Sequence, residues 1–539
     1  MAATPATSLT LVSSGLADAR QRPSLGNPDV NQFVKVLKKT TRWASQLNRV
    51  EFDGAPEFGT RVSMTLPRIG ELVAGFTLAV TMPDIYAPQL AAIKAAGGTS
   101  FDASGAFLGP VYGWTNSLGH ALIQTIELEI GGTIVQTLDG RLLEILDELH
   151  ESLEAVIAKN AMIKRKPNGF NARTWLTPTP LTVYIPIPFW FSRRGITSHA
   201  LPLEALAAEI VRVHVTFRPI AELYYTEARV NTATVGYRAG TDPAAATPPA
   251  MWPLAGGRFW IADATATGRV YDMNAEMPAG GVPGKLIDGI TMPTRFSPDA
   301  AYALVEYISL EEYEALAFRS AELTYPVEQH VAVPVTATQT AKEVRLELPY
   351  SNPTKEILWV TQRPEVATYN AWFLFTRDLG PVVPPQATAA EKSPCAVPWW
   401  PDAVLLPTAG QRWEVVPAFR TAFSEPLQGA ALLYNSYDRF VHEGGSFFRG
   451  VVPSQFFTKS AVHNRYVYAY AFGQRRPFAA PYGPRGAANW DKIPRKEAFF
   501  TMAAGRGGVP PPAMNLYVYV TIWNIFKVYG GRGGLLFTN

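Results

Sequence analysis

The stretch that decides the fold runs from Trp114 to Gly132 and reads Trp-Thr-Asn-Ser-Leu-Gly-His-Ala-Leu-Ile-Gln-Thr-Ile-Glu-Leu-Glu-Ile-Gly-Gly. From Ile123 onward apolar and polar residues alternate, which is the period-two pattern of a half-buried strand. We therefore expect strand structure over Ile123–Leu138. Gly131-Gly132 within it indicates a β-turn or bulge more than a nucleotide site.

A helix is predicted directly after this strand, over Arg141–Val156. It would begin after a capping turn at Asp139-Gly140. One face carries an apolar stripe formed by Leu142, Leu143, Ile145, Leu146 and Leu149. The acidic residues are expected to face outward on the opposite side; they are Glu144, Asp147, Glu148 and Glu151.

The bulk composition favours a large protein assembly over an electrostatic binder. With 539 residues the chain exceeds the roughly 250–300 at which one core stops growing, so two or more domains are expected. Only 17% of residues are charged, against about 25% in typical proteins, which suggests that much surface is covered in an assembly. The net charge of +3 provides no strong field to attract nucleic acid or an anionic membrane.

Targeting signals and disulfides are not expected. Cys395 is the only cysteine, so no intrachain disulfide can form, and we expect folding in the reducing cytosol. Residues Met1–Arg20 lack the pattern of a signal peptide, and no apolar run has the length of a membrane span.

Short alternating segments separated by turn-forming residues predict an all-β sandwich in each half. The expected strands of the first half are Phe33–Trp43, Arg61–Leu66, Leu72–Met82, Ile123–Leu138, Thr182–Phe191, Ile210–Phe217 and Ala301–Leu310. Those of the second half are Thr324–Val335, Glu343–Leu348, Glu356–Thr361, Ala430–Val441, Arg465–Phe472, Ala498–Met502 and Asn515–Tyr529. A second short helix is expected at Glu204–Ala208, after Pro202.

Three long stretches rich in Ala, Pro, Gly and Thr interrupt these strands: Pro83–Gly113, Glu222–Pro298 and Arg363–Pro426. Loops of this length are uncommon unless they serve a function or are disordered. In an eight-stranded jelly roll with strands B to I, the BC, DE, FG and HI connections leave at one end. The three stretches would be DE and HI of the first roll and DE of the second. They should therefore project from the same end.

Along most of its length the chain resembles the major capsid proteins of nucleocytoplasmic large DNA viruses, as in iridoviruses and phycodnaviruses. The strongest segment is Trp114–Gly132, followed by the helix. The other matching segments are Phe33–Trp43, Phe58–Leu72, Ile187–Ser192, His199–Leu206, Leu304–Leu310, Tyr325–His330, Pro353–Val360, Asn435–Phe440 and Asn515–Phe537. The long Glu222–Pro298 stretch and the element Asn489-Trp-Asp-Lys492 depart from the family pattern.

The resemblance implies an all-β double jelly roll, two consecutive eight-stranded antiparallel rolls with long insertions at one end and a few short helices. The expected parts are an N-terminal arm (1–30), a first roll (31–312, with an insertion at 222–298), a linker (313–322) and a second roll (323–539). The implied function is that of a structural protein, a homotrimeric pseudo-hexagonal capsomer that tiles an icosahedral shell. It would be made and assembled in the host cytoplasm and reside in the virion. Its partners would be other copies, neighbouring capsomers, minor capsid and penton proteins, and an inner layer or internal membrane contacted by the arm.

Catalytic, cofactor and metal sites are not predicted. Gly530-Gly-Arg-Gly-Gly534 lacks the Lys-Ser/Thr and the helix of a phosphate loop, so we interpret it as a structural tail. The histidines have no zinc-ligand spacing; they are His120, His150, His199, His214, His330, His442 and His463. His214 is expected to be hydrogen-bonded within a sheet.

Paired carboxylates and basic clusters are interpreted as structural. Glu127/Glu129 and Glu311/Glu312 could serve a glycosidase, but a solvated or interface-paired strand face is favoured. Cys395 has no nearby histidine to activate it. Lys35–Arg42 and Lys164–Lys166 could touch nucleic acid, but each has an ordinary explanation, since the first alternates along a strand edge and the second follows a helix end. No specific nucleic-acid partner is expected.

Two other functions stay open at this point. One is a β-sandwich enzyme or lectin that acts on carbohydrate, which would require an aromatic groove with convergent carboxylates. The other is a trimeric double jelly-roll scaffold or minor capsid component, which sequence alone separates poorly from a major capsid protein.

Overall fold

The strands of the first half of the chain form two facing sheets. Their bounds are β1 (Trp43–Glu51), β2 (Arg61–Thr65), β3 (Leu72–Met82), β5 (Ile123–Ile130), β6 (Thr133–Asp139), β7 (Leu181–Pro186), β9 (Val211–Phe217) and β16 (Ala300–Leu310). One sheet has the order β1-β16-β3-β7, with the short β8 (Leu201–Pro202) beside β3, and the other has the order β2-β9-β5-β6. With strands lettered B to I, these orders are B-I-D-G and C-H-E-F, those of a jelly roll.

The computed structural model describes residues 42–83, 111–165, 181–192, 199–227, 297–364, 372–377, 425–461, 465–473, 486–504 and 510–537, with five short strands between 254 and 291. Ser45–Asn539 forms one unit that contains both rolls, and Met1–Ala44 forms a separate one. No helix among the described residues is both long and apolar enough to cross a membrane.

The second half repeats the same topology. Its main strands are β17 (Leu323–Ala332), β19 (Glu343–Glu347), β20 (Pro353–Gln362), β21 (Leu427–Tyr434), β22 (Tyr437–Gly444), β23 (Val467–Ala471), β25 (Lys496–Met502) and β26 (Asn515–Tyr529). They form sheets of order β17-β26-β20-β23 and β19-β25-β21-β22, again B-I-D-G and C-H-E-F. The short β18 (Thr336–Ala337), β24 (Ala488–Asn489) and β27 (Arg532–Leu535) extend the first of these. The predicted double jelly roll is confirmed.

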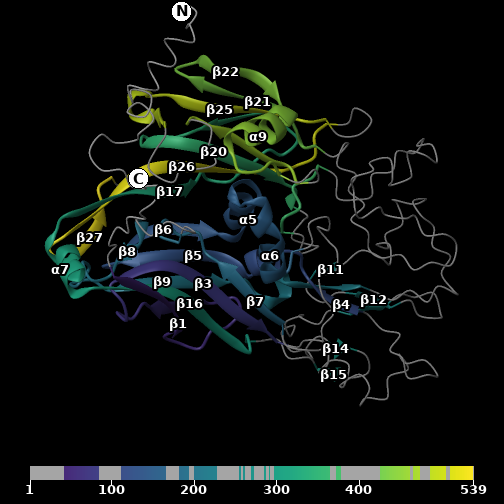
Figure 1. Cartoon of the computed structure of the whole chain (residues 1–539). Coiled ribbons are helices and arrows are strands. Elements are labelled where there is room, and N and C mark those ends of the chain that lie inside the picture. Colours follow the sequence, from purple (N-terminus) through teal and green to yellow (C-terminus); the bar gives the residue numbers. More distant parts are fainter. Residues whose placement is uncertain are drawn as a thin grey trace, which may run out of the picture. The chain divides into compact units, whose positions relative to one another are not determined.

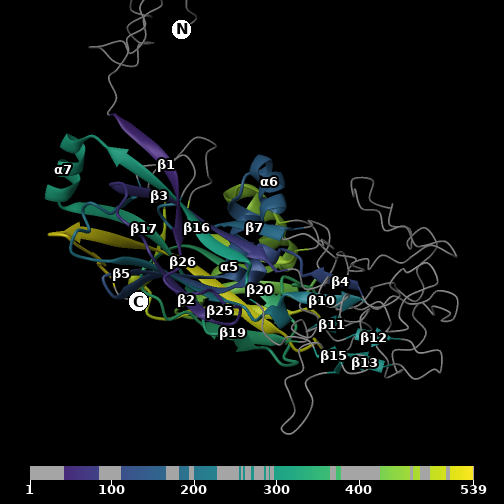
Figure 2. The ribbon, with the colours of Figure 1, turned by 90° about the horizontal axis from the view of Figure 1, so that it is seen from below.

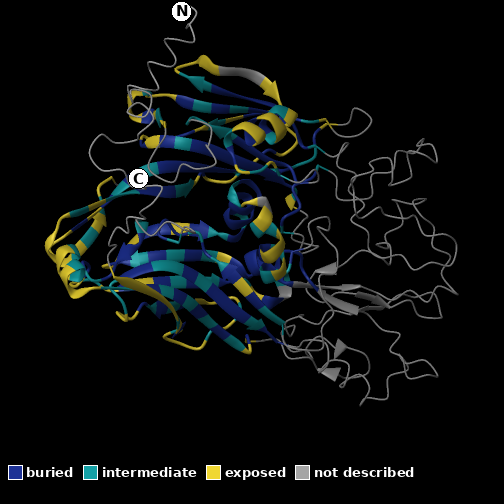
Figure 3. Ribbon diagram, viewed as in Figure 1, coloured by how far each residue is buried: buried dark blue, intermediate teal, exposed yellow. Residues whose placement is uncertain are grey.

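Alternation along each strand separates the core from the outer faces. In β3, Phe76, Leu78 and Val80 are almost completely buried between the two sheets, whereas Thr77 and Thr81 point to the opposite face and are half-buried. Figure 1 shows the four sheets following one another, with β22 of the second roll at the top and β1 of the first roll at the bottom. The B-I-D-G sheet of the second roll lies between its own core and the first roll, and its strand β20 is buried from Glu356 to Gln362 (Figure 3).

Helices fill the connections between strands. They include α4 (Leu118–Leu122), α5 (Gly140–His150), α6 (Leu153–Ile163), α7 (Glu312–Ser320) and α9 (Val452–Phe456), preceded by the π-helical turn η6 (Phe447–Val451). The single helix predicted over Arg141–Val156 is two helices, because Glu151 is extended and Ser152 caps a new helix through the backbone N–H of Ala155. Most of the predicted linker 313–322 is helical. The predicted helix Glu204–Ala208 is wrong, since residues 203–208 form turns.

Several predicted strands have different limits. The strand expected to end at Trp43 begins there and continues to Glu51, while residues 33–41 lie outside the described part of the chain. The stretch Ala430–Val441, predicted as one strand, is a hairpin of β21 and β22. Asn435 and Ser436 form its turn with positive φ values of 52° and 70°. Asn tolerates such backbone geometry, so this turn could have been recognised from the sequence.

The three long stretches contact one another at the few of their residues that the structure describes. The backbone of β4 (Val111–Trp114), at the end of the first stretch, pairs with β10 (Tyr224–Glu227) in the second, and β10 pairs with β11 (Leu254–Ala255). The indole Nε1 of Trp372, in the third, donates to the carbonyl oxygen of Glu222 over 2.7 Å. The short pairs β12 (Phe259–Ile261)/β13 (Arg269–Tyr271) and β14 (Lys285–Leu286)/β15 (Ile290–Thr291) belong to the second stretch. Most of the remaining residues of these stretches lie outside the described ranges.

Replacing Gly131 by Val should destabilise the first roll. Gly131 and Gly132 form the predicted turn between β5 and β6, with φ values of 59° and 85°. A β-carbon at Gly131 would lie 2.5 Å from Cδ of Glu209, and a β-branched residue is strained at positive φ. We expect a loss of about 2–4 kcal/mol in the free energy of unfolding, measured by urea titration. A change below about 0.5 kcal/mol, within the range of neutral surface substitutions, would contradict this.

Candidate functional site: the interface between the two jelly rolls

The acidic face of α5 is buried, contrary to the prediction that it faces outward. Glu144 is 0% exposed, and Asp147 and Glu148 are 2% exposed each. The prediction failed because helical periodicity identifies faces but not what covers them. Here the apolar stripe packs on the first roll and the acidic face meets cations from α6 and from the second roll.

Glu144 is the centre of this buried cluster. Its carboxylate accepts hydrogen bonds from Ser117 Oγ (3.1 Å) and Arg165 Nη2 (2.5 Å), lies 2.6 Å from His120 Nδ1, and is ion-paired with Arg465. Burial by itself would raise the carboxyl pKa, but Arg165 and Arg465 outweigh burial and hold the pKa of Glu144 well below its usual range. Burial lowers the pKa of His120. The cluster therefore contains an ionised Glu144 and a neutral His120 near pH 7.

The remaining carboxylates of α5 are also paired. Asp147 pairs with Arg165 and Lys159, which depress its pKa against the effect of burial. Glu148 lies 3.2 Å from Arg465 Nη1 and 3.9 Å from Lys459 Nζ. Two of these four cations, Arg465 and Lys459, belong to the second roll. Burial of so many charges is tolerable only because opposite charges are matched within the cluster.

A second polar cluster lies further along the same interface. Nε2 of His150, the last residue of α5, is 3.1 Å from Oε1 of Glu356 on β20. The same oxygen accepts a hydrogen bond from Thr521 Oγ1 on β26 (3.2 Å), whose hydroxyl lies 3.0 Å from His330 Nδ1 on β17. Three adjacent strands of the second roll are thus linked to one helix end of the first.

The first roll contacts the outer face of the β17-β26-β20-β23 sheet at several of its strands. Near β17, Gln329 Nε2 donates to the carbonyl oxygen of Val135 on β6 over 2.6 Å. On β26, the Tyr519 hydroxyl donates to Asp139 over 2.8 Å, and the Arg141 guanidinium lies 3.5 Å from the ring centroid of Tyr517. Directly before β23, Arg465 joins the Glu144 cluster. The interface is therefore extensive enough to fix the two rolls relative to each other.

The glycine-rich tail, which the sequence indicates as a structural element, forms a hairpin of β26 and β27 that completes the interface. Gly530 and Gly531 turn β26 into β27 with φ values of 61° and 82°. The backbone N–H of Gly533 donates to Oε2 of Glu209 in the first roll over 2.8 Å. A β-carbon at Gly533 would lie 2.6 Å from side-chain atoms of Leu206 and Phe526, so only glycine allows this approach.

A small cavity of about 170 Å³ lies where the two rolls meet at the start of α5. Arg218 stacks 3.8 Å from the Trp372 ring centroid on its wall, and Arg141 Nη2 donates to Gln362 over 3.1 Å. The volume is well below the roughly 300–1,000 Å³ of ligand pockets. The cavity is lined by Gln124, Asp139, Gly140, Arg141, Arg218, Trp372 and Phe373.

The other residues singled out by the sequence have structural surroundings. Glu127 pairs with Arg61 (2.6 Å) and Glu129 with His214 (2.5 Å) across neighbouring strands of the same sheet. Glu311 and Glu312 are exposed at the start of α7. Lys164 is the C-cap of α6, which agrees with the helix-end interpretation of Lys164–Lys166, and Arg165 is buried in the Glu144 cluster.

Some candidates can be placed only in part. His199 directly precedes the buried Ala200 and β8, and the backbone of His442 is part of β22. Cys395, His463, Lys166 and residues 35–41 lie outside the described ranges. Within those ranges, no three His, Cys, Asp or Glu side chains are grouped so that they could hold a metal ion.

Stability should fall as the pH drops from about 6.5 towards 4. Burial lowers the pKa of His330 from its ordinary value of 6.5 to about 4, so the folded state binds fewer protons in this window than the unfolded chain. The contribution of His330 to the free energy of unfolding is complete above pH 6.5 and is lost as the pH falls through the folded-state pKa. It amounts to at most about 3 kcal/mol.

This dependence can be measured by urea unfolding at pH 7, 5.5 and 4, at one protein concentration. His330→Gln removes the titrating group and should reduce the dependence of the free energy of unfolding on pH. The lowered pKa of His120 acts in the same direction and leaves a residual slope. If the free energy of unfolding changed with pH equally in the variant and in the unmodified chain, His330 would not titrate as described.

The comparisons with known proteins agree with this architecture. Residues 31–252 match the family described as major capsid protein N-terminus, and residues 314–534 match that described as large eukaryotic DNA virus major capsid protein. Capsid protein 1 of Acanthamoeba polyphaga mimivirus is 29% identical over 37% of this chain, and the match spans only 32% of that protein's length. The major capsid protein of Paramecium bursaria Chlorella virus 1 is 22% identical over 95% of this chain and 96% of its own. Among solved structures, a chain of the PBCV-1 virus capsid has the same fold, with a TM-score of 0.61 at 18% identity, covering 94% of this chain and 100% of that one.

Proposed function

Because the chain belongs to the major capsid protein family of large eukaryotic DNA viruses, it is a structural protein of a virion capsid, and we propose that it forms homotrimeric capsomers of the outer shell. Three copies would contribute six similar jelly rolls around a threefold axis. Such a ring has a pseudo-hexagonal outline, and one chain type can then tile an icosahedral shell.

The observation that carries this proposal is the repetition of one topology in two rolls joined by a buried interface. Both rolls have the sheet orders B-I-D-G and C-H-E-F. The contact between them is heterologous, since the F strand β6 and the helix α5 of the first roll meet the outer face of the B-I-D-G sheet of the second. Head-to-tail contacts close into rings when the rotation permits it.

The division of the chain follows from this proposal. Residues 1–30 would be an arm at the base of the capsomer, 31–312 and 323–539 the two rolls, and 313–322 the connection between them. The arm would contact minor capsid proteins or an internal membrane. The three long stretches would form the outward end of the capsomer. Neighbouring capsomers and penton proteins would be the lateral partners, after assembly in the host cytoplasm.

A structural role accounts better than catalysis for the polar groups that the structure describes. The carboxylates of Glu127 and Glu129, which could suggest a glycosidase, are each paired with a side chain on an adjacent strand, Arg61 and His214 respectively. The large aromatic side chains Trp359 and Tyr468 stack on each other in the core, not along a groove. We therefore propose no enzymatic activity for the chain.

The decisive experiment is the mass of the purified protein by size exclusion with light scattering. We expect about three times the 59.0 kDa of one chain without added metal or ligand. A variant that lacks Arg229–Pro249, within the proposed outward stretches, should remain trimeric. A stable monomer of the unmodified chain would contradict the capsomer. Loss of the trimer in the deletion alone would contradict the placement of this stretch.

A further inference from the structure

The small cavity between the two rolls, at the start of α5, combines two arginine side chains with space for a small ion. We propose that it binds a free inorganic oxyanion of the phosphate class, held between the guanidinium groups of Arg141 and Arg218. This site does not depend on the number of copies in the capsomer. Its occupant would join α5 of the first roll to the groups of the second roll that contact the same two arginines.

Arg141 is a partly buried cation whose direct contacts are with uncharged groups. Its Nη2 donates to the amide oxygen of Gln362 over 3.1 Å, and its guanidinium lies 3.5 Å from the ring centroid of Tyr517. None of the ion pairs among the described residues includes Arg141. Its Nε is buried and has no hydrogen-bond partner in the described part of the chain. Arg141 therefore has both an unbalanced charge and an unused donor.

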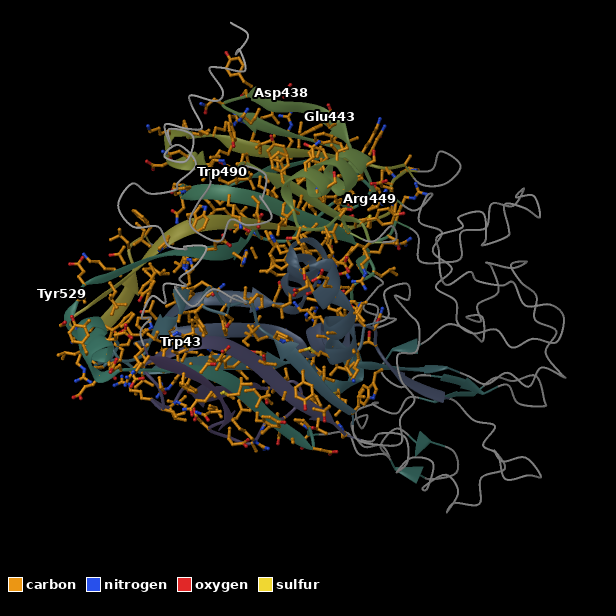
Figure 4. The ribbon with its side chains drawn as sticks, viewed as in Figure 1. Trp43, Asp438, Glu443, Arg449, Trp490 and Tyr529 are labelled. Atoms are coloured by element: carbon orange, nitrogen blue, oxygen red, sulfur yellow. The ribbon has the colours of Figure 1, made fainter. Side chains whose placement is uncertain are left out.

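Other arginines of the two rolls show what such a side chain normally contacts. Arg165 and Arg465 are paired with Glu144. Arg449 of the second roll, labelled in Figure 4, lies 3.3 Å from Glu425. A guanidinium carries five N–H donors and does not lose its charge, so its burial without an anionic acceptor costs free energy. An anion in the cavity would supply the acceptor that the described residues do not offer to Arg141.

Arg218 brings a second positive charge to the same cavity. Its Nε donates to the carbonyl oxygen of Ala121 over 2.9 Å and its Nη1 to Glu222 over 3.2 Å, while its guanidinium stacks on Trp372. These contacts fix its position. Burial lowers the pKa of Arg218 in spite of the pairing with Glu222, and the positive charge of Arg141 acts in the same direction as burial. The two cations therefore repel each other, and an anion between them would offset that repulsion.

The charge and the volume of the cavity both fit a small oxyanion. The charged side chains of its lining are the two arginines and one carboxylate, Asp139, which leaves one positive charge in excess. Both oxygens of Asp139 are already engaged, by the backbone N–H of Leu142 and by the hydroxyl of Tyr519. A volume of about 170 Å³ has room for several water molecules, so the five atoms of a phosphate ion fit. It is too small for a nucleotide or another drug-sized ligand.

The position of the cavity explains what a bound ion would do. Figures 1 and 2 show α5 next to β20 and β26 of the second roll, in agreement with the contacts of Arg141. The helix begins at Gly140 in the cavity wall, where its dipole adds partial positive charge. Gln124 on β5 also lines the cavity and is exposed, so an ion can enter from this side. Arginine forks bind tetrahedral oxyanions through paired hydrogen bonds, and a bound ion would therefore stabilise the contact between the rolls.

Titration of the full-length protein with inorganic phosphate tests this site directly. Isothermal titration calorimetry at pH 7 should show saturable binding of one phosphate per chain. Unfolding should require more urea in sodium phosphate than in sodium chloride of equal ionic strength, because a ligand that binds only the folded state stabilises it. Sulfate, which has the same tetrahedral shape, should compete with phosphate. O-phosphoserine should compete much more weakly, because its ester group makes it larger than the free ion that the cavity holds.

A carboxylate introduced at the cavity wall should abolish the response to phosphate. In Gln124→Glu the new side chain competes with the anion for the two arginines and repels it, so the affinity for phosphate should fall at least about tenfold. The matched control is Gln428→Glu, the same change at an exposed position of β21 that does not line the cavity. The control should bind phosphate like the unmodified chain, and urea unfolding in chloride should show both variants folded.

Three results would overturn the anion site. They are the absence of saturable phosphate binding, an equal affinity of Gln124→Glu and Gln428→Glu for phosphate, and binding of O-phosphoserine as tight as that of the free ion. If Gln124→Glu fails to fold, Arg218→Lys decides, because it keeps the charge but not the fork. Its affinity for phosphate should also fall, and an unchanged affinity would contradict the site. Phosphate binding by a monomeric chain would support the site and contradict only the proposed capsomer.

Discussion

Replacing Glu144 by Ala is expected to destabilise the protein by about 3–5 kcal/mol, because removal of one partner from a buried ion pair leaves an uncompensated charge. Glu144 is in contact with both Arg165 and Arg465, which are buried with it. Asp147 and Glu148 can neutralise these arginines only in part, since both already bind lysines. The measurement is urea unfolding followed by tryptophan fluorescence.

Two further variants show whether the charge or the packing matters. Glu144→Gln keeps a hydrogen-bond acceptor and nearly the same volume but loses the charge, so it should cost less than Glu144→Ala. Glu154→Ala removes an exposed carboxylate from the neighbouring α6 and should change stability by no more than about 0.5 kcal/mol. If Glu144→Ala were no worse than Glu154→Ala, the buried cluster would not stabilise the contact between the rolls.

Adding a single methyl group at Gly140 should have an effect of similar size. Gly140 is the first residue of α5, and a β-carbon there would overlap the carbonyl oxygen of His120 and lie 2.5 Å from that of Ile123. Both obstacles are backbone atoms, which cannot move aside as a flexible side chain can. Gly140→Ala should therefore displace the start of α5 and, with it, the Glu144 cluster. We expect a loss of at least about 3 kcal/mol.

The matched control for this substitution is Gly534→Ala. Gly534 lies in β27, its φ is not in the left-handed region, and an added β-carbon would have no other atom within 4 Å. Its replacement should be close to neutral, within about 0.5 kcal/mol. The trimer content of Gly140→Ala, measured by light scattering, should decrease together with its stability, because the displaced α5 no longer holds the two rolls. A fully stable Gly140→Ala variant would show that the backbone around His120 can relax.

The losses of stability expected for Glu144→Ala and Gly140→Ala have a common origin. Gly140 allows α5 to start close to α4, and this position places Glu144 beside His120 and opposite Arg465 of the second roll. The arrangement of the two rolls therefore depends on a glycine at the start of one helix and on a carboxylate one turn further along. In the proposed capsomer, this contact would hold the two rolls of each copy in one fixed arrangement.

Much of the fold follows from local sequence patterns. Alternation of apolar and polar residues located most strands, because the side chains of a strand point to opposite faces whatever the rest of the chain does. Gly131-Gly132 was recognised as a turn, because its backbone geometry is one that glycine adopts without strain. The order and spacing of the segments also carried the resemblance to major capsid proteins. The hairpin at Asn435-Ser436 and the break between α5 and α6 were missed although both have local signals.

The site itself could not be predicted from the sequence. Arg465 follows Glu144 by 321 positions, and no local pattern connects them. An acidic helix face has the same sequence whether it meets water or a matching set of cations, so only the tertiary structure decided that Glu144, Asp147 and Glu148 are buried. The physical reason is that periodicity is a property of one element, whereas burial and ion pairing depend on the elements that pack against it.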